Sequence, residues 1–386
     1  MTRRYRRSRH VLCYWTDAGA LVYNYATAVQ AQATDLTWQL LDYCAKWRTP
    51  VDVRRAVAPR LPQGVVGELL ESLVSATFFE TSDRSRPPSE VRMDAWRKWN
   101  PSAGFFHTVS RQSTWGDRDA FNRRLETKAR TSPMPVSIKP PSRSRLTLPD
   151  AFRTTAISEV LIDRRTWRRF GKQPIERVEL AQLLRLTSGI THWLTVPGLG
   201  EVPLKTSPSG GARHPIETYV LALEVSDVPA GIYRYAPERH ELDLLREGAT
   251  RQELEKLIPK QPWFANAAVV FFFTAVFERT QWRYEFARAY RTVLLEAGHV
   301  CQTFLLTATS LGLAPFSTMA IDDARLEALL GVDGISEAVL YAAGAGTRPA
   351  SKGRTITPPG DLAPRTRVND LRRARALHRN AEELPG

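Results

Sequence analysis

An uninterrupted apolar run, AAVVFFFTAVF at residues 267–277, constrains the fold of this chain more than any other segment. Its β-branched and aromatic residues favour a strand, and the lack of a polar face indicates that other elements cover it on both sides. A long helical pattern follows over residues 280–311, and another strand is expected at residues 338–343. This alternation, which begins near residue 155, predicts a mixed α+β or α/β domain.

Shorter elements of the same domain precede that run. Apolar spacing predicts helices around residues 157–161 and 180–184. A strand is expected over residues 218–223, and a hairpin over residues 231–245 that turns at residues 237–239. The 386 residues therefore suffice for one domain of ordinary size with substantial additions at its ends.

Residues 1–82 are predicted to form a small unit of their own. Two short strands, residues 10–15 and 20–25, would be joined by a turn at Asp17-Ala18-Gly19. Thr49, Pro50 and Asp52 form a typical helix start, with a capping hydroxyl, a proline at the first position and a carboxylate at the third. Two more helices, around residues 36–44 and 65–74, and a strand at residues 78–81 complete a winged-helix-like order.

This order of elements resembles the PqqD-like domains that bind leader segments of ribosomal peptide precursors. The resemblance implies that a peptide is bound as an added strand at an exposed sheet edge. A winged helix that only packs on the main domain, or one that binds DNA, is the alternative reading of the same layout.

The remaining regions are basic and rich in proline. Residues 83–154 lack clear periodicity and are expected to be a linker wrapped over a neighbour, and residues 351–386 form a basic tail. The net charge of +14 permits an anionic cofactor, an acidic peptide, nucleic acid or an anionic membrane surface as a partner. Charge alone does not choose among them.

Several classes of protein are disfavoured by composition. Cys13, Cys44 and Cys301 lie far apart without ligand spacing, so neither a disulfide framework nor a metal site is expected. The segment after the basic N-terminus is too polar for a signal peptide, which predicts a cytoplasmic protein. The most apolar long segment, residues 293–313, carries Glu296 and other polar residues, so a membrane span is not expected.

Three clusters carry residues suited to binding an anionic or flat ligand. Residues 164–170, RRTWRRF, place four guanidiniums within six positions, which suits phosphate binding but also fits a solvated face. Residues 206–217 place Ser209 beside paired glycines in a loop that leads into a strand, where a backbone can approach a ligand closely. Residues 344–348, GAGTR, could bring another arginine to the same phosphate.

Taken together and in order, RRTWRRF, PSGGARHPIE, RAYRTVLLEAGHVCQ and YAAGAG resemble the SagB-type flavin dehydrogenases, a branch of the nitroreductase family, over about residues 155–350. The resemblance implies a nitroreductase-like FMN-binding fold, with a central mixed sheet and long helices. It also implies an obligate homodimer whose FMN sites lie between the subunits. The long helix at residues 280–311 then need not be buried within one chain.

The resemblance also assigns roles to individual residues. It implies that the arginine segment and the residues after the last strand contact the FMN phosphate, ribityl chain and pyrimidine edge, that the glycine loop lies along the isoalloxazine, and that residues 318–322 place backbone N–H near flavin N5. Gln302 would supply an amide beside the flavin. The implied cofactor residues are Arg164, Arg165, Thr166, Arg168, Ser209, Gly210, Gly211, Gln302, Met319, Ala320, Gly346 and Arg348.

The implied reaction is the oxidation of a ribosomally made precursor peptide, from azoline to azole or across a Cα–Cβ bond. The flavin takes a hydride, a protein base removes a proton, and O₂ reoxidises the flavin. The Lys-Tyr pair of azoline oxidases is replaced here by Arg283-Tyr284 or Tyr284-Glu285, depending on register. Tyr284, Glu285 and His214 are the candidate bases, whereas Arg283 can only orient a group or stabilise an anion.

Two other functions fit the same sequence. A general NAD(P)H-dependent nitroreductase or quinone reductase would have no evident use for the N-terminal unit. A non-catalytic scaffold that binds a peptide or nucleic acid fits the arginine-rich termini, although the matched flavin residues argue against it. For the azoline reaction, a cyclodehydratase is the expected partner enzyme.

Overall fold

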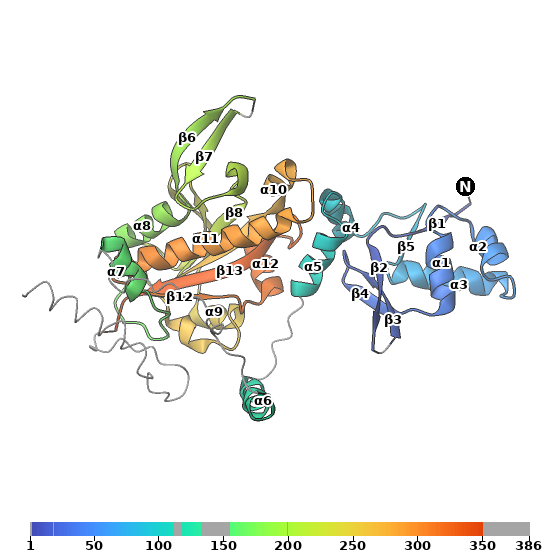
Figure 1. The fold of residues 1–386 in the computed structure, drawn as a ribbon, viewed down its shortest axis with the longest axis horizontal. Coiled ribbons are helices and arrows are strands. Elements are labelled where there is room, and N and C mark those ends of the chain that lie inside the picture. The colour runs from blue at the N-terminus through green and yellow to red at the C-terminus, as the bar shows by residue number, and fades with distance from the viewer. Residues whose placement is uncertain (1, 18, 112–117, 133–154, 199, 350–386) are drawn as a thin grey trace, which may run out of the picture.

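The computed structural model describes residues 2–17, 19–111, 118–132, 155–198 and 200–349. Its centre is a six-stranded sheet in the order β10-β9-β8-β11-β13-β12, in which every neighbouring pair is antiparallel (Figure 1). The expected strands are present, but the described strands of this sheet are antiparallel throughout, not mixed as the resemblance implied, because no parallel crossover joins two of them. Strand β12 is an addition that the sequence pattern did not predict. The strands are β8 (Ile216–Ala222), β9 (Gly231–Ala236), β10 (Glu241–Glu247), β11 (Val269–Val276), β12 (Ala314–Thr318) and β13 (Glu337–Gly346).

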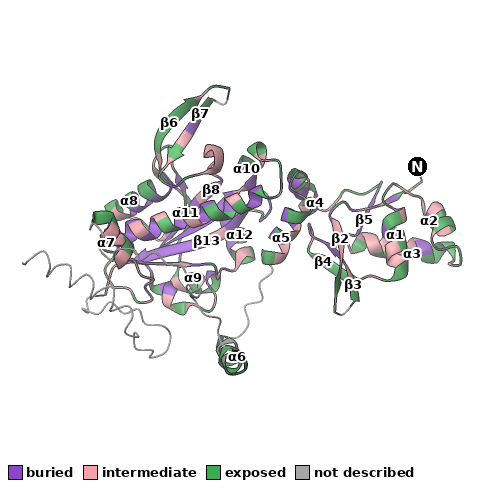
Figure 2. Cartoon of the chain, in the orientation of Figure 1, coloured by how far each residue is buried: buried purple, intermediate pink, exposed green. Residues whose placement is uncertain are grey.

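Strand β11 is buried on both faces, as its apolar sequence predicts. Phe271 and Phe273 pack on one face, in a cluster with α8 (Arg177–Ser188) and α11 (Ala289–Ser310). Val270 and Phe272 point to the other face, where α9, α12 and the short helix η3 cover them. Figure 2 shows buried residues gathered along β13 and beneath α11. The covering elements are α9 (Arg251–Leu257), η3 (Pro262–Asn266) and α12 (Asp323–Leu330).

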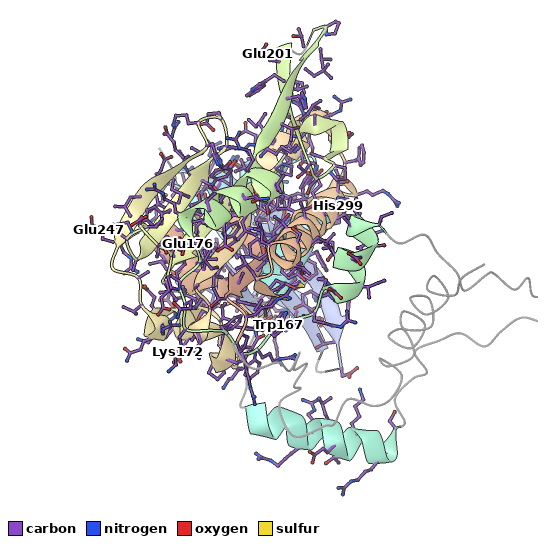
Figure 3. All side chains as sticks on the ribbon, turned by 90° about the vertical axis from the view of Figure 1, so that its left-hand side faces the viewer. Trp167, Lys172, Glu176, Glu201, Glu247 and His299 are labelled. Atoms are coloured by element: carbon purple, nitrogen blue, oxygen red, sulfur yellow. The ribbon has the colours of Figure 1, made fainter. Side chains whose placement is uncertain are left out.

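A two-stranded hairpin projects from this body. Strands β6 (Ile190–Val196) and β7 (Gly200–Lys205) pair only with each other and form what we call the arm (Figure 1). Glu201, labelled in Figure 3, lies near its tip. Trp193 and Leu194 on the arm are exposed. Helix α7 (Ala156–Asp163) contacts α11 and begins at a capping Thr155.

The prediction of one helix over residues 280–311 is wrong. The structure has α10 (Phe277–Arg283) and α11, separated by a break at which Tyr284 is extended, with φ −122° and ψ 96°. The indole Nε1 of Trp99 donates a hydrogen bond of 2.8 Å to the carbonyl of Tyr284. This tertiary contact satisfies a carbonyl that a continuous helix would have used internally.

The N-terminal region contains the strands and helices that the sequence predicts, with two further strands. Strands β2 and β3 pair antiparallel, and Thr49 and Asp52 form the expected reciprocal cap. Strand β1 pairs with β5 and strand β4 with β3, and neither β1 nor β4 was expected. The elements are β1 (Tyr5–Arg7), β2 (Val11–Thr16), β3 (Gly19–Asn24), β4 (Val29–Gln32), α1 (Asp35–Tyr43), α2 (Pro50–Ala56), α3 (Gln63–Ser75) and β5 (Phe79–Thr81).

Residues 83–111 and 118–132 are largely helical, although the sequence predicted a linker without periodicity. Trp96 and Trp99 are completely buried and pack against Phe277 and Tyr290 of the sheet domain. The helices are α4 (Pro88–Met93), η1 (Asp94–Trp96), α5 (Ser102–Arg111) and α6 (Arg118–Thr131). The basic tail and the rest of the expected linker lie outside the described residues.

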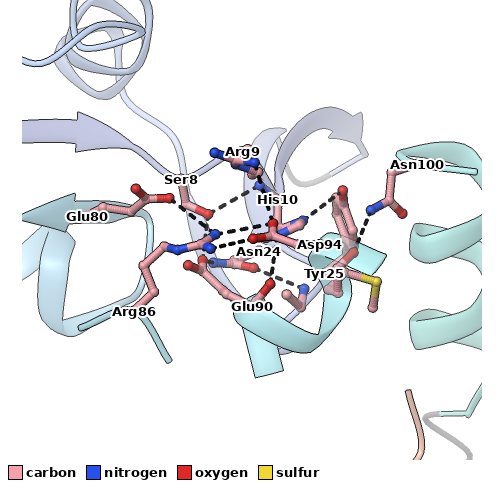
Figure 4. A network of polar contacts seen from close by, with 12 residues as sticks. Ser8, Arg9, His10, Asn24, Tyr25, Glu80, Arg86, Glu90, Asp94 and Asn100 are labelled. Carbon is pink, nitrogen blue, oxygen red and sulfur yellow. Dashed lines mark hydrogen bonds and ion pairs between the residues drawn. The ribbon is translucent and has the colours of Figure 1, made fainter. Parts of the chain in front are cut away.

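A polar network ties the start of this helical segment to the N-terminal strands (Figure 4). The carboxylate of Glu90, only 1% exposed, accepts hydrogen bonds from Ser8 Oγ at 2.5 Å and Asn24 Nδ2 at 2.6 Å. Asp94 forms an ion pair with Arg86 and lies 3.1 Å from His10 Nε2.

Among the described helices, none is both long and apolar enough to cross a membrane.

Candidate functional site

The glycine loop forms a tight turn against the N-terminal half of α11. The backbone N–H of Gly210 donates to Glu296 Oε1 at 2.8 Å, and Gly211 has a left-handed φ of 63°. A Cβ at Gly211 would overlap the side chain of Arg283. Burial raises the pKa of the Glu296 carboxyl, which is 4% exposed. The left-handed backbone and the close approach of Arg283 therefore favour glycine at position 211, whereas a Cβ on Gly210 would lie 3.0 Å from the Thr292 methyl group.

Two of the predicted catalytic residues lie on this turn. The ring of Tyr284 is 3.5 Å from where a Cβ on Gly210 would be, and the guanidinium carbon of Arg283 is 5.7 Å from the Tyr284 ring centroid. We call Ser209, Gly210, Gly211, Arg283 and Tyr284 the turn cluster.

His214 borders the turn cluster. Its backbone N–H donates to Ser209 Oγ at 2.8 Å, and its φ of 43° is left-handed. Its Nε2 lies 2.9 Å from the Pro203 carbonyl, which can only accept, so Nε2 carries the proton. Burial and the charge of Lys205 lower the pKa of His214 to about 4, so the ring is neutral at pH 7.

Two other predicted residues do not join this cluster. Glu285 is exposed and forms an ion pair with Lys98. Gln302 is exposed on α11, about 1.7 helical turns beyond Glu296.

The arginine segment lies at the other end of α11, beside β12 and β13. The backbone N–H of Trp167, labelled in Figure 3, donates to the Pro315 carbonyl at 2.9 Å. Arg348 Nε donates to the Leu313 carbonyl at 3.1 Å, and its guanidinium carbon is 5.6 Å from the Trp167 ring centroid. We call this group the arginine cluster, which contains Arg164, Arg165, Thr166, Trp167, Arg168, Gly346 and Arg348.

The members of the arginine cluster are held in different ways. Arg164 ends α7 and Thr166 is half-buried, whereas Arg165 donates to the carbonyls of Ile162 and Arg164, each at 2.7 Å. Gly346 lies so close to Phe170 that a Cβ there would be about 2.9 Å from the ring.

Two predicted cofactor residues lie just beyond β12, outside this cluster. Met319 is 71% exposed, and the Ala320 N–H donates to Thr318 Oγ1 at 3.0 Å.

Arg168 differs from its neighbours because part of its guanidinium is buried without a partner among residues 2–17, 19–111, 118–132, 155–198 and 200–349. Its Nε is inaccessible and makes no hydrogen bond to any described residue, while the guanidinium carbon lies 6.0 Å from the Trp263 ring centroid. A buried donor without an acceptor costs about 1–3 kcal/mol, more if it is charged. This arrangement fits a bound group that offers an oxygen acceptor to the arginine.

One chain does not bring the two clusters together. The turn cluster is bonded to Glu296, whereas Arg348 Nη2 reaches the Thr309 carbonyl at 3.4 Å. These two positions on α11 are about 20 Å apart at the rise of an α-helix. Apart from Gln302, Met319 and Ala320, the predicted cofactor residues therefore form two groups at opposite ends of one helix.

Three residues near these groups were not singled out from sequence. Glu296 lies within the quoted EAGH motif, so its position was visible although its bond to Gly210 was not. Lys205 and Trp263 belong to no quoted motif, and only their tertiary positions reveal them.

Comparison with known proteins identifies the class of fold. The sequence pattern of the nitroreductase family matches residues 161–347, which span the sheet, the turn cluster and all of the arginine cluster except Arg348. A protein of Methanocaldococcus jannaschii named as a nitroreductase is 36% identical over 185 residues, covering 48% of this chain and 88% of that protein. The chain belongs to the nitroreductase family of flavin oxidoreductases.

Two further relatives share only part of their length with this chain. The trifolitoxin-processing protein TfxB of Rhizobium leguminosarum is 32% identical over 168 residues, which cover 42% of this chain and 44% of that protein. A solved nitroreductase of Anabaena variabilis is 28% identical, with a TM-score of 0.41, and the match covers 50% of this chain and 38% of that one.

Proposed function

We propose that this protein is an FMN-dependent oxidoreductase that dehydrogenates a ribosomally made peptide, from azoline to azole or across a Cα–Cβ bond. The observation that carries the cofactor assignment is the buried Nε of Arg168, which has no hydrogen-bond partner among the described residues, in a nitroreductase-family domain. The peptide assignment is supported by the similarity to a protein named for trifolitoxin processing.

The arginine cluster would hold the FMN. Arg168 would bond an oxygen of the cofactor, and Arg164 and Arg348 would contribute positive charge near the phosphate. When bound, FMN supplies a two-electron acceptor for hydride. The cofactor roles of the other members, and of Met319, Ala320 and Gln302, stay predictions.

A second copy of the chain would complete the site. Because the clusters are about 20 Å apart on one α11, a single chain cannot place both against one flavin. A two-fold dimer that brings the turn cluster of one copy to the arginine cluster of the other would do so. The backbone at Gly210 and Gly211 would keep its present conformation in such a dimer, because both glycines are already packed by side chains of their own chain.

Tyr284 is the best-placed group to accept the proton. Arg283 stays protonated, Glu285 is engaged by Lys98, and a His214 with pKa about 4 is a weak base at neutral pH. Tyr284 would take up the proton as its phenolate, and its ring lies against Gly210 with the positively charged Arg283 guanidinium over it.

The N-terminal unit would hold the peptide away from the reacting residue. Strands β2 and β4 form the two edges of a three-stranded sheet, and each offers main-chain groups to an added strand. A leader segment bound there by β-addition would leave the rest of the precursor free to reach the flavin domain. If azolines are the substrate, a cyclodehydratase must supply them.

The test uses the purified full-length protein. Its visible spectrum should show bound oxidised flavin, and denaturation should release FMN at about one per chain. The holoenzyme in air should then remove 2 Da from a thiazoline-containing peptide, read by mass spectrometry. A colourless protein that FMN does not reconstitute would contradict the cofactor assignment. Rapid NADPH oxidation with a quinone, without peptide turnover, would favour the general reductase suggested by the M. jannaschii relative.

A further inference from the structure

A cavity of about 260 Å³ lies at the base of the arm, between the end of β7 and the turn that joins β9 to β10. We call it the arm-base pocket. Its charged lining consists of four cationic side chains and two carboxylates. They are Lys205, Arg213, Arg234, Arg279, Glu217 and Glu238.

The carboxylates of this pocket are already engaged. Arg279 forms an ion pair with Glu217 at 2.5 Å, and Glu238 forms one with Arg239 at 2.8 Å. Arg234, a third cation of the wall, is bonded to Asp243 at 2.8 Å. The acidic groups around the pocket therefore leave little negative charge for its remaining cations.

Lys205 and Arg213 are those remaining cations. Within the described part of the chain, neither has a carboxylate oxygen within 4 Å. Arg213 Nε donates to the Gly211 carbonyl at 3.0 Å, and its guanidinium carbon is 5.2 Å from the Trp282 ring centroid. Burial lowers the pKa of the Lys205 ammonium. Holding a cation in such surroundings costs free energy that a bound anion would offset.

The walls favour one kind of anion. Glu217 and Glu238 would repel a doubly charged phosphate more than a singly charged carboxylate. The volume of about 260 Å³ is small for a ligand site and suits one acidic side chain and its adjoining backbone.

The pocket is continuous with the turn cluster. His214 lines it, and the backbone N–H of the same residue is bonded to Ser209 Oγ. The Arg213 side chain reaches back to the Gly211 carbonyl. A ligand group in the pocket therefore lies within a few residues of the turn that is proposed to meet the flavin.

We propose that the arm-base pocket binds the carboxylate of an acidic residue in the peptide substrate, with Lys205 and Arg213 as its counter-ions. This rests on the proposed function and adds a specificity to it. Peptides with an acidic residue near the oxidised position would be selected. The shared recognition chemistry is the carboxylate, whether from a peptide or from a free small acid.

The test compares two uncharged-backbone probes that differ in one group. N-acetylglutamate α-amide carries a single side-chain carboxylate, and N-acetylglutamine amide is its neutral counterpart. Titration calorimetry on the full-length protein should detect saturable binding of the glutamate probe only. Lys205→Met should weaken that binding roughly tenfold or more, because a hydrogen-bonded charge is lost. Lys205→Arg should retain most of it.

A matched control removes the same charge elsewhere. Lys256→Met on α9, where the side chain is exposed, should leave binding of the glutamate probe unchanged. Equal binding of both probes, or no effect of Lys205→Met, would overturn the pocket assignment. Binding of inorganic phosphate in preference to the glutamate probe would overturn the choice of a carboxylate.

The outcomes separate this inference from the proposed function. Flavin content is read from the visible spectrum of the same samples, so a protein without flavin that still binds the glutamate probe contradicts the enzyme assignment alone. If turnover is observed, replacing the acidic residue of the substrate peptide by its amide should raise KM at least tenfold with little change in kcat. A fall in kcat with unchanged KM would instead contradict a binding role.

Discussion

The two ends of α11 carry the two predicted parts of the site, yet they are built differently. At the N-terminal end, the Gly210 N–H is bonded to Glu296 and Gly211 is packed by Arg283, so the turn is complete without a ligand. At the C-terminal end, the buried Nε of Arg168 has no hydrogen-bond partner in the part of the chain that the structure describes. The difference suggests that the N-terminal end of α11, which we call the finished end, offers a flavin a surface whose polar groups are already paired. The C-terminal end, which we call the unfilled end, would bind the flavin through a donor that is still available.

The largest effect should come from removing the proposed proton acceptor of the finished end. Tyr284→Phe should lower kcat about a hundredfold or more, because general acid–base groups contribute at least that much. Bound FMN should stay unchanged, as shown by the flavin spectrum. Tyr43→Phe on α1, far from either cluster, is the control. Loss of FMN together with activity would show that the turn holds the cofactor as well.

A substitution at the unfilled end should instead weaken FMN binding. Arg168→Met should weaken FMN binding roughly tenfold to a hundredfold, because a charge-assisted bond of about 1.5–3 kcal/mol is lost. Fluorescence titration of flavin-free protein measures this. Arg169→Met, at an exposed neighbouring position, should bind FMN as the unaltered protein does. An unchanged FMN affinity of Arg168→Met would contradict the proposal that the C-terminal end of α11 binds the cofactor through Arg168.

A mixing experiment tests whether the ends meet across two copies. Tyr284→Phe and Arg168→Met chains, each poorly active alone, are refolded together. Random pairing gives half mixed dimers, each with one intact site, so activity should recover to about a quarter of that of the unaltered protein. No recovery, although light scattering shows mixed dimers, would mean that each site is formed within one chain.

The smallest effect concerns stability at the finished end. The pKa of His214 is lowered from 6.5 to about 4 in the folded chain. Between these two pH values the unfolded chain therefore binds a proton at His214 that the folded chain does not bind. The contribution of His214 to the free energy of unfolding should therefore be fully present above pH 6.5 and should decrease as the pH falls toward 4. His214→Gln should flatten that part of the curve in urea unfolding measured at several pH values. A steeper curve in the variant would contradict the assignment.

Local patterns in the sequence predicted much of the fold. The apolar run at residues 267–277 became β11, buried on both faces, because alternate side chains of a strand meet two different layers. The Thr49–Asp52 cap formed as expected, because its contacts lie within one turn. Such features need no knowledge of distant residues.

The errors come from contacts between distant parts of the chain. The break between α10 and α11 depends on Trp99, which is 185 residues away from the Tyr284 carbonyl that it bonds. Trp96 and Trp99 lie in a region dominated by proline, serine and arginine, and their burial depends on Phe277 and Tyr290. The separation of the two site clusters likewise follows only from the length of α11.

The segment from Arg86 to Trp99 has a consequence for exchanging parts between related proteins. On one side, Glu90 is buried among donors from the N-terminal strands, and on the other the indoles lie in the core of the sheet domain. A chimera joined at residue 82 would bury the Glu90 carboxylate without Ser8 and Asn24. Recombination that moves residues 2–111 as one block would keep these donors. The block would meet the recipient through the buried indoles, which tolerate neighbours of similar volume, and through polar contacts such as Trp99 with the Tyr284 carbonyl, which the recipient must match.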